Sequence, residues 1–243
     1  MNALWRRDWT VLGMQKAWKV MNVEAVNAEA PRPSNAQVWP RHSDNWYVEE
    51  TWCDKRIFDV EDVPGGMVYD PHCGMGRVLD AAAAAGHFAF GSDIRDRGAK
   101  HPVTISSVFD LDFEKLRGAS VFSNPPYSRA QGRKIVELLV SELAAGTFDK
   151  VALILPATFM YSDKAAPWFE ANKPARVWIM VPRPSMPPGD VVELGLDAKG
   201  GKEDFAWHVW TAENLVLGAD PTFRWLRRDG FNNRLFLNQE DRT

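Results

Sequence analysis

The sequence predicts an α/β fold built on a mostly parallel, seven-stranded sheet with helices on both faces. Short apolar segments alternate with segments of helical composition from residue 66 to residue 210. Alternation of this kind is typical of a parallel sheet that is covered by its crossover helices. Polar residues also follow three of the apolar segments, and such folds bind ligands at the carboxyl ends of their strands.

Seven segments have the length and composition of buried strands. Residues 67–70 and 88–93 each end in an aspartate, and residues 151–155 are wholly apolar and stop at Pro156. Short apolar runs are typical of strands that are covered on both faces. The expected strands are 67–70, 88–93, 103–108, 121–123, 151–155, 176–181 and 205–210.

Three of the intervening segments are expected to be helices. Residues 78–85 are rich in alanine, the best helix former, and Gly86 follows them as a C-cap. Residues 130–145 repeat apolar side chains at helical spacing, and Gly146 ends the pattern. Residues 163–171 also have a composition that suits a helix.

The composition is that of a soluble globular protein in a reducing, cytoplasmic setting. Hydrophobic residues make up 45% and charged residues 25% of the 243 positions, which fits one domain with a full core. No apolar run approaches the roughly 20 residues that span a bilayer, and no signal-peptide core is visible. The lack of such a run predicts that the protein has no membrane partner. Cys53 and Cys73 lack metal-ligand spacing, so we expect no metal site and no disulfide framework.

The most informative motif is the Asn-Pro-Pro-Tyr segment at residues 124–127. Two consecutive prolines fix φ and remove N–H donors, so the segment is the rigid end of a strand rather than its interior. The Asn124 side-chain oxygen and the Pro125 carbonyl are each able to accept one N–H of a planar amino group. Tyr127 supplies a flat face for stacking, so the motif predicts a clamp for an aromatic amine.

A glycine-containing loop, Asp70 to Gly76, follows the first expected strand. Gly74 and Gly76 let the backbone approach a ligand, and Asp93 lies 17 residues after Gly76, close to the roughly 20 at which an acid meets ribose hydroxyls. The loop lacks the third glycine of the dinucleotide fingerprint and the Gly-Lys-Ser/Thr of phosphate-binding loops. A nucleoside ligand without phosphates, such as S-adenosylmethionine, fits this pattern.

Together these motifs resemble the class I S-adenosylmethionine-dependent adenine-N6 methyltransferases, over roughly residues 45–210. The resemblance implies a Rossmann-like methyltransferase fold and methyl transfer to adenine N6 in DNA. It implies that Asn124, Pro125, Pro126 and Tyr127 are catalytic. It implies that Asp70, Pro71, Cys73, Gly74, Gly76, Asp93 and Asp110 bind the cofactor. The segment 46–57 stands where the family has a helix that closes over the methionine.

The order of the motifs resembles the gamma arrangement, and the compact size is similar to small methyltransferases of phages and mobile elements. We expect residues 1–45 to form an N-terminal arm and residues 46–243 to form the methyltransferase catalytic domain. Residues 29–35 contain two prolines among polar residues, as linkers do.

Nucleic acid, most plausibly DNA, is the expected partner. The net charge of −3 does not by itself indicate such a partner, but a local basic rim is sufficient for phosphate contacts, and eleven tryptophans favour base stacking. We expect the loops 128–134 and 182–202 to contact the substrate. The candidate substrate-binding residues are Arg129, Arg133 and Lys202 for phosphates, and Phe205 and Trp207 for the wall opposite Tyr127.

Other functions use the same clamp and stay open at this point. An RNA adenine-N6 methyltransferase and a protein glutamine N-methyltransferase both present a planar NH2 group to such a motif. A non-catalytic, nucleic-acid-binding methyltransferase-like protein is a further alternative. A nicotinamide oxidoreductase is disfavoured by the missing third glycine and by the two prolines.

Overall fold

The computed structural model describes residues 44–160, 163–195 and 203–229, and the side chains of residues 129 and 130 are excluded from this description. The expected N-terminal arm, apart from its last two residues, therefore lies outside the described residues. Within those ranges, no helix combines the length and apolarity that crossing a membrane requires. Cys53 and Cys73 are both free thiols and both buried.

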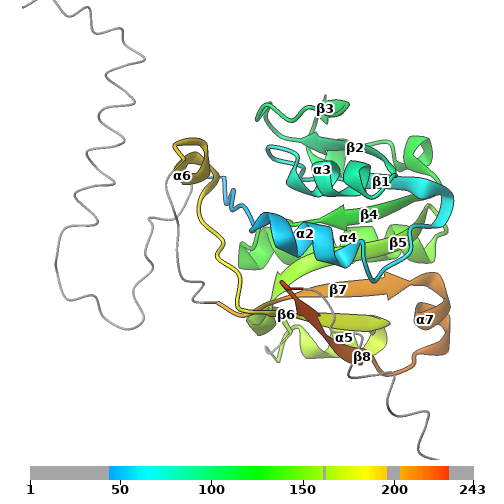
Figure 1. Ribbon diagram of the computed structural model, residues 1–243. Helices are drawn as coiled ribbons and strands as arrows, with labels where there is room; N and C mark the ends of the chain where they lie inside the picture. Colours follow the sequence, from blue (N-terminus) through cyan, green and yellow to red (C-terminus); the bar gives the residue numbers. More distant parts are fainter. Residues whose placement is uncertain (1–43, 161–162, 196–202, 230–243) are drawn as a thin grey trace, which may run out of the picture. The chain divides into compact units, whose positions relative to one another are not determined.

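In the described part of the chain, eight strands form one sheet in the order β3-β2-β1-β4-β5-β7-β6-β8 (Figure 1). Every neighbouring pair is parallel except that β7 runs antiparallel to both β5 and β6. The strands are β1 (Met67–Asp70), β2 (Phe88–Asp93), β3 (Val103–Ile105), β4 (Ala119–Ser123), β5 (Phe148–Pro156), β6 (Arg176–Val181), β7 (Phe205–Thr211) and β8 (Thr222–Arg227). The first seven strands have the arrangement of the Rossmann-like methyltransferase fold, and β8 extends the sheet beyond β6.

Helices cover both faces of the sheet (Figure 1). On one face, Ile57 and Leu79 pack with Phe122 and Trp207 of the strands. On the other face, Leu139 packs in a second apolar cluster with the strand side chains that point to that face. The helices are α2 (Thr51–Ile57), α3 (Arg77–Ala84), α4 (Arg129–Ala144), α5 (Ala166–Ala171), α6 (Gly189–Glu193) and α7 (Ala212–Leu217).

The expected elements are present, with two differences at the sheet edges. The third strand ends at Ile105 rather than at residue 108, because Ser107 caps a short 3-10 helix that begins at Val108. Strand β8 was not expected from the sequence. Leu226 is its one buried side chain and the other five are exposed, so the strand lacks the apolar signal of a core strand.

Three strand ends place polar residues at one edge of the sheet. Strands β2, β1 and β4 are adjacent and parallel, so Asp93, Asp70 and Asn124 all emerge at the same edge. The chain builds the sheet outward in opposite directions from β1 and β4, which makes this edge the topological switch point where open α/β sheets bind ligands. The sheet order therefore brings the two sequence motifs together.

A buried ion-pair network anchors the segment after α2 to the centre of the sheet. The Glu61 carboxylate accepts hydrogen bonds from Lys150 of β5 (3.0 Å) and from Arg176 (2.5 and 2.7 Å) and Trp178 (2.8 Å) of β6. Burial by itself raises the pKa of Glu61, but the hydrogen bonds from Arg176 and Trp178 and the Lys150 charge outweigh it, so the pKa lies below its ordinary value. The carboxylate is therefore ionised and fully partnered.

We predict that Glu61→Ala lowers the free energy of unfolding by about 3 kcal/mol, because it removes the acceptor that buried Lys150 shares with Arg176. The Lys150 ammonium then keeps only the exposed Asp62 carboxylate as its counter-charge. Urea denaturation measures the change. Lys115→Ala is the matched control, since the Lys115–Asp112 pair is 80% and 57% exposed. An exposed pair contributes less than about 1 kcal/mol, so equal losses from the two variants would contradict the anchoring role.

Candidate active site

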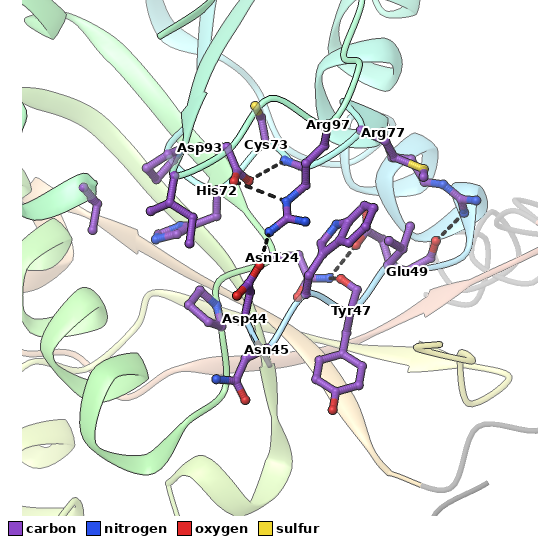
Figure 2. Close-up of a pocket in the computed structure, with 18 of the residues that line it drawn as sticks. Asp44, Asn45, Tyr47, Glu49, His72, Cys73, Arg77, Asp93, Arg97 and Asn124 are labelled. Carbon is purple, nitrogen blue, oxygen red and sulfur yellow. Dashed lines mark hydrogen bonds and ion pairs between the residues drawn. The ribbon is translucent and has the colours of Figure 1, made fainter. Parts of the chain in front are cut away.

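A cavity of about 280 Å³ opens at the edge where β1, β2 and β4 end (Figure 2). The glycine loop forms one wall, and the segment that precedes α2 forms the facing wall. The lining residues are 44–49, 71–75, Arg77, Asp93, Ile94, Arg97, Ser107, Val108, Asn124, Pro126 and Gln131. In the described residues, no group of His, Cys, Asp and Glu side chains has an arrangement that holds a metal ion.

Asp93 ties the end of β2 to the glycine loop. One carboxylate oxygen accepts the Gly74 N–H at 3.0 Å, and the other accepts the Arg95 N–H at 3.0 Å and the Arg97 Nε–H at 3.3 Å. Arg97 also donates to Asp44 at 3.2 Å, and its guanidinium lies 4.1 Å from the centre of the Trp46 ring. Asp93 is thus in the position expected for a ribose-binding acid, with Arg97 as a neighbour that the sequence did not indicate.

The two glycines of the loop have different roles. Gly74 lines the cavity with a left-handed φ of 53°, and a Cβ there would lie 2.9 Å from Trp46 Nε1. Gly76 does not line the cavity: it is the N-cap of α3, and its Cβ would lie 3.0 Å from Ala99 Cβ. Of the two glycines predicted to let the backbone approach a ligand, only Gly74 therefore lines the cavity.

Asp70 supports the loop from beneath and does not line the cavity. Its Oδ1 accepts the His72 N–H at 3.0 Å and the Ser123 hydroxyl at 2.6 Å, so it links the glycine loop to the end of β4. Burial raises the pKa of Asp70 to about 8, and the neighbouring Glu49 and Asp93 carboxylates add to the rise. Of the loop residues expected to bind the cofactor, Pro71 and Cys73 line the cavity.

His72 is a neutral polar group in the cavity wall. Its Nδ1 lies 3.3 Å from Ser123 Oγ, and its Nε2 is buried without a hydrogen-bond partner. Burial lowers the pKa of His72 to about 3, so the imidazole is uncharged at neutral pH. The ring therefore adds no positive charge to the cavity.

Asn124 has partners on both sides of its amide. Its Nδ2 donates to the Tyr47 carbonyl at 3.2 Å and to the Glu49 carboxylate, and its Oδ1 accepts the Tyr127 hydroxyl. The Tyr127 and Phe205 ring centres lie 5.3 Å apart, so the two rings contact each other and leave no space for a base between them. Phe205 is therefore not the opposite wall that the sequence predicted, and it lines a different cavity. Tyr127 does not itself line the cavity, whereas Pro126 does.

Two predicted site residues are placed elsewhere by the structure. Trp207 is fully buried and its indole donates to the Cys53 carbonyl at 3.2 Å, so it is a core residue and not a substrate wall. Asp110 is exposed and does not line the cavity, because the chain turns into a 3-10 helix after Ser107. Ser107 and Val108 line the cavity in its place.

The basic residues proposed for phosphate contacts are only partly accounted for. Arg133 is hydrogen-bonded to Glu137 at 2.6 Å and to the Lys164 carbonyl, so its guanidinium is engaged within the protein. The side chain of Arg129 and the whole of Lys202 lie outside the described residues.

Residues 44–49 form a wall of the cavity. The resemblance placed residues 46–57 beside the methionine, whereas the sequence did not indicate Asp44 and Asn45. The Val48 N–H donates to the Pro187 carbonyl at 2.9 Å, and the Gly189 N–H donates to the Trp46 carbonyl at 3.0 Å. A Cβ on Gly189 would come within 2.2 Å of the Trp46 ring, so glycine is required for this approach. The aromatic pair directly before a helix was the available signal, but it has no periodic pattern.

Comparisons with known proteins bear on the fold alone. No protein-family model matches the chain, and no curated protein matches it either. Among solved structures, it is similar to a modification subunit of a putative type I restriction enzyme from Vibrio vulnificus, with a TM-score of 0.49 and 10% identity over 92% of this chain and 54% of that one. This chain thus spans about half of that subunit.

Two further structures are matched over most of their own lengths. A putative RNA methyltransferase from Pyrococcus horikoshii has a TM-score of 0.42 and 12% identity over 80% of this chain and 98% of that one. Magnesium protoporphyrin IX methyltransferase from Synechocystis, with S-adenosylmethionine bound, has a TM-score of 0.42 and 14% identity over 84% and 85%.

We predict that Asp70→Asn flattens the pH dependence of stability. A carboxyl whose pKa is raised to about 8 in the folded state binds a proton that the unfolded chain releases near its ordinary value of 3.8. Its contribution to stability is therefore complete below the ordinary value and is lost as the pH rises through about 8, by up to about 1.4 kcal/mol per pH unit. Asparagine retains the acceptor oxygen without this loss.

Urea denaturation at about pH 5 and about pH 8 tests this sign. The stability of Asp70→Asn relative to the unsubstituted protein should increase between the two conditions. Parallel pH profiles would show that Asp70 is ionised in the folded state.

Proposed function

We propose that this protein transfers a methyl group from S-adenosylmethionine to the N6 amino group of adenine in DNA. One observation carries the proposal: the Asn124 amide lies in the wall of the same cavity as the glycine loop and Asp93. The amine clamp and the nucleoside site are thus two parts of one site, on the Rossmann-like methyltransferase sheet. We further propose that residues 46–243 are the catalytic domain and that residues 1–45 are an arm to it.

The cavity suits a cationic nucleoside. The Gly74 backbone lines the cavity with Trp46 packed against it, and the Asp93 carboxylate at the end of β2 is the acceptor for ribose hydroxyls. The Glu49 and Asp93 carboxylates both line the cavity, which favours a ligand that carries positive charge. Arg77 lines it as well and is the candidate partner for the methionine carboxylate. When bound, the cofactor supplies an electrophilic methyl group on a sulfonium.

The chain's own contribution to the reaction is alignment and electrostatic preorganisation. The Asn124 oxygen and the Pro125 carbonyl each accept an N–H of the target amine, which directs the nitrogen lone pair toward the methyl donor. The adjacent prolines hold these acceptors in place, because their φ angles are restricted. The site needs no strong general base for this role.

The choice of adenine in DNA rests on the aromatic wall and on the amide clamp. We assign stacking on the target base to Tyr127, whose hydroxyl bonds Asn124 and whose ring is backed by Phe205. Extrusion of a base from a duplex costs a few kcal/mol, which stacking and hydrogen bonds offset. An RNA adenine or a glutamine side chain would present the same NH2 group, so substrate class is decided by experiment.

The direct test incubates the protein with labelled S-adenosylmethionine and, separately, with DNA, RNA and a glutamine-containing peptide. We expect label in DNA, and nucleoside mass spectrometry should identify N6-methyladenine. Label in RNA or peptide alone would replace the proposed substrate, and no label in any substrate would reject the activity. Asn124→Ala serves as the inactive control for each arm.

We predict opposite consequences for two variants of the site. Asp93→Ala should weaken S-adenosylmethionine binding about tenfold or more, because a hydrogen bond to a charged group contributes roughly 1.5–3 kcal/mol. Asn124→Ala should abolish methyl transfer while cofactor affinity stays within a few-fold, because Asn124 contacts the substrate amine. Isothermal titration calorimetry and single-turnover rates measure the two effects. Equal loss of cofactor affinity in both variants would contradict the division of roles.

A further inference from the structure

An amide side chain works as an amine clamp in only one of its two orientations. The oxygen of Asn124 accepts an N–H, whereas its NH2 group repels one, and the two orientations differ by a half-turn about the last side-chain bond. The proposed reaction therefore requires something that holds the amide with Oδ1 toward the substrate.

We propose that Glu49 is the positioning residue that sets the orientation of the Asn124 amide; this inference rests on the proposed function. Glu49 precedes α2 and is only 5% exposed. Its carboxylate accepts from Asn124 Nδ2, and the Tyr47 carbonyl accepts from the same nitrogen at 3.2 Å (Figure 2). A flipped amide would bring its oxygen against the Tyr47 carbonyl oxygen, which is an acceptor only, and against the oxygen of Glu49.

The opposite side of the amide is consistent with the same orientation. The Tyr127 hydroxyl donates to Asn124 Oδ1. Burial, together with the nearby Glu49 carboxylate, raises the pKa of Tyr127, so the phenol keeps its proton and stays a donor. The hydroxyl uses one lone pair of the amide oxygen and leaves the other for the substrate amine.

The backbone around Glu49 is held from two directions. Arg77 Nη1 donates to the Glu49 carbonyl at 2.5 Å, which links the wall to the start of α3. Two backbone hydrogen bonds to the 187–189 loop fix the preceding residues. Val48 N–H donates to the Pro187 carbonyl at 2.9 Å, and Gly189 N–H donates to the Trp46 carbonyl at 3.0 Å. Glu49 is therefore a fixed acceptor rather than a long side chain free to follow Asn124.

If Glu49 acted only through its charge, its variants would have different kinetics. If its charge mainly attracted the cationic cofactor, Glu49→Gln and Glu49→Ala would weaken cofactor binding alike and leave kcat unchanged. If Glu49 positions the amide, Glu49→Gln retains an acceptor oxygen for Nδ2, whereas Glu49→Ala removes it. The two variants thus separate the hydrogen bond from the charge.

The test measures kcat and cofactor Kd for both variants on the substrate that the unsubstituted protein methylates. Both variants remove the charge, so we expect the same cofactor Kd in both. We expect Glu49→Ala to lower kcat about tenfold or more, and Glu49→Gln to retain most of kcat. Glu50→Ala is the matched control. In the described structure Glu50 accepts from Trp52 and from the Ser185 N–H and makes no hydrogen bond to Asn124, so this variant should retain kcat. An unchanged kcat in Glu49→Ala would overturn the inference, whereas an inactive unsubstituted protein would instead reject the proposed function.

A second pair of variants decides the matter if Glu49→Ala does not fold. Asn124→Asp places a carboxylate against Glu49, so the two like charges should displace the clamp and lower kcat. Adding Glu49→Gln supplies an NH2 donor to the new aspartate and leaves its other oxygen for the substrate. We expect the double variant to be at least about tenfold faster than Asn124→Asp alone, and a double variant that is no faster would overturn the inference.

Discussion

The site depends on the parallel pairing of β1 with β2 and with β4. Parallel neighbours end at the same edge, so Asp70, Asp93 and Asn124 converge although 54 positions of the sequence separate the first from the last. The Ser123 hydroxyl then joins β4 to Asp70 at 2.6 Å, and Asp93 joins β2 to Gly74 at 3.0 Å. These two hydrogen bonds fix the strand ends and the glycine loop relative to one another and so define one wall of the cavity.

The electrostatics of the cavity follow from how each carboxyl is solvated. Asp93 pairs with Arg97 at 3.3 Å, whereas buried Asp70 has a pKa raised to about 8 and is mainly neutral at pH 7. Asp54 is fully buried, and burial together with the Glu49 carboxylate raises its pKa as well. Burial thus suppresses negative charge on the carboxyls that do not line the cavity.

The wall opposite the glycine loop is built from contacts distant in sequence. Trp46 packs against Gly189, Asp44 pairs with Arg97, and Glu49 accepts from Asn124. The Glu61 network holds the other end of this region to β5 and β6. The wall is therefore fixed at both ends, which is the condition for an amide to be held in one orientation.

The sequence by itself determined the architecture and the polar strand ends that meet at the cavity. The seven core strands, α3, α4 and the polar strand ends were all predicted, because burial on two faces leaves short apolar runs and because proline and glycine mark where those runs end. The cavity contacts of Asp93 and Gly74 follow from the same local rules.

Tertiary structure alone decided which side chains complete the site. Trp207 lies in the same alternating strand as Phe205, and only the packing of α2 shows that it is a core residue. Asp110 was assigned by its distance along the chain, but the turn after β3 directs Ser107 and Val108 to the cavity instead. Arg97, Tyr47 and Glu49 carry no periodic signal, because their roles depend on partners 4, 77 and 75 residues away rather than on a pattern of burial.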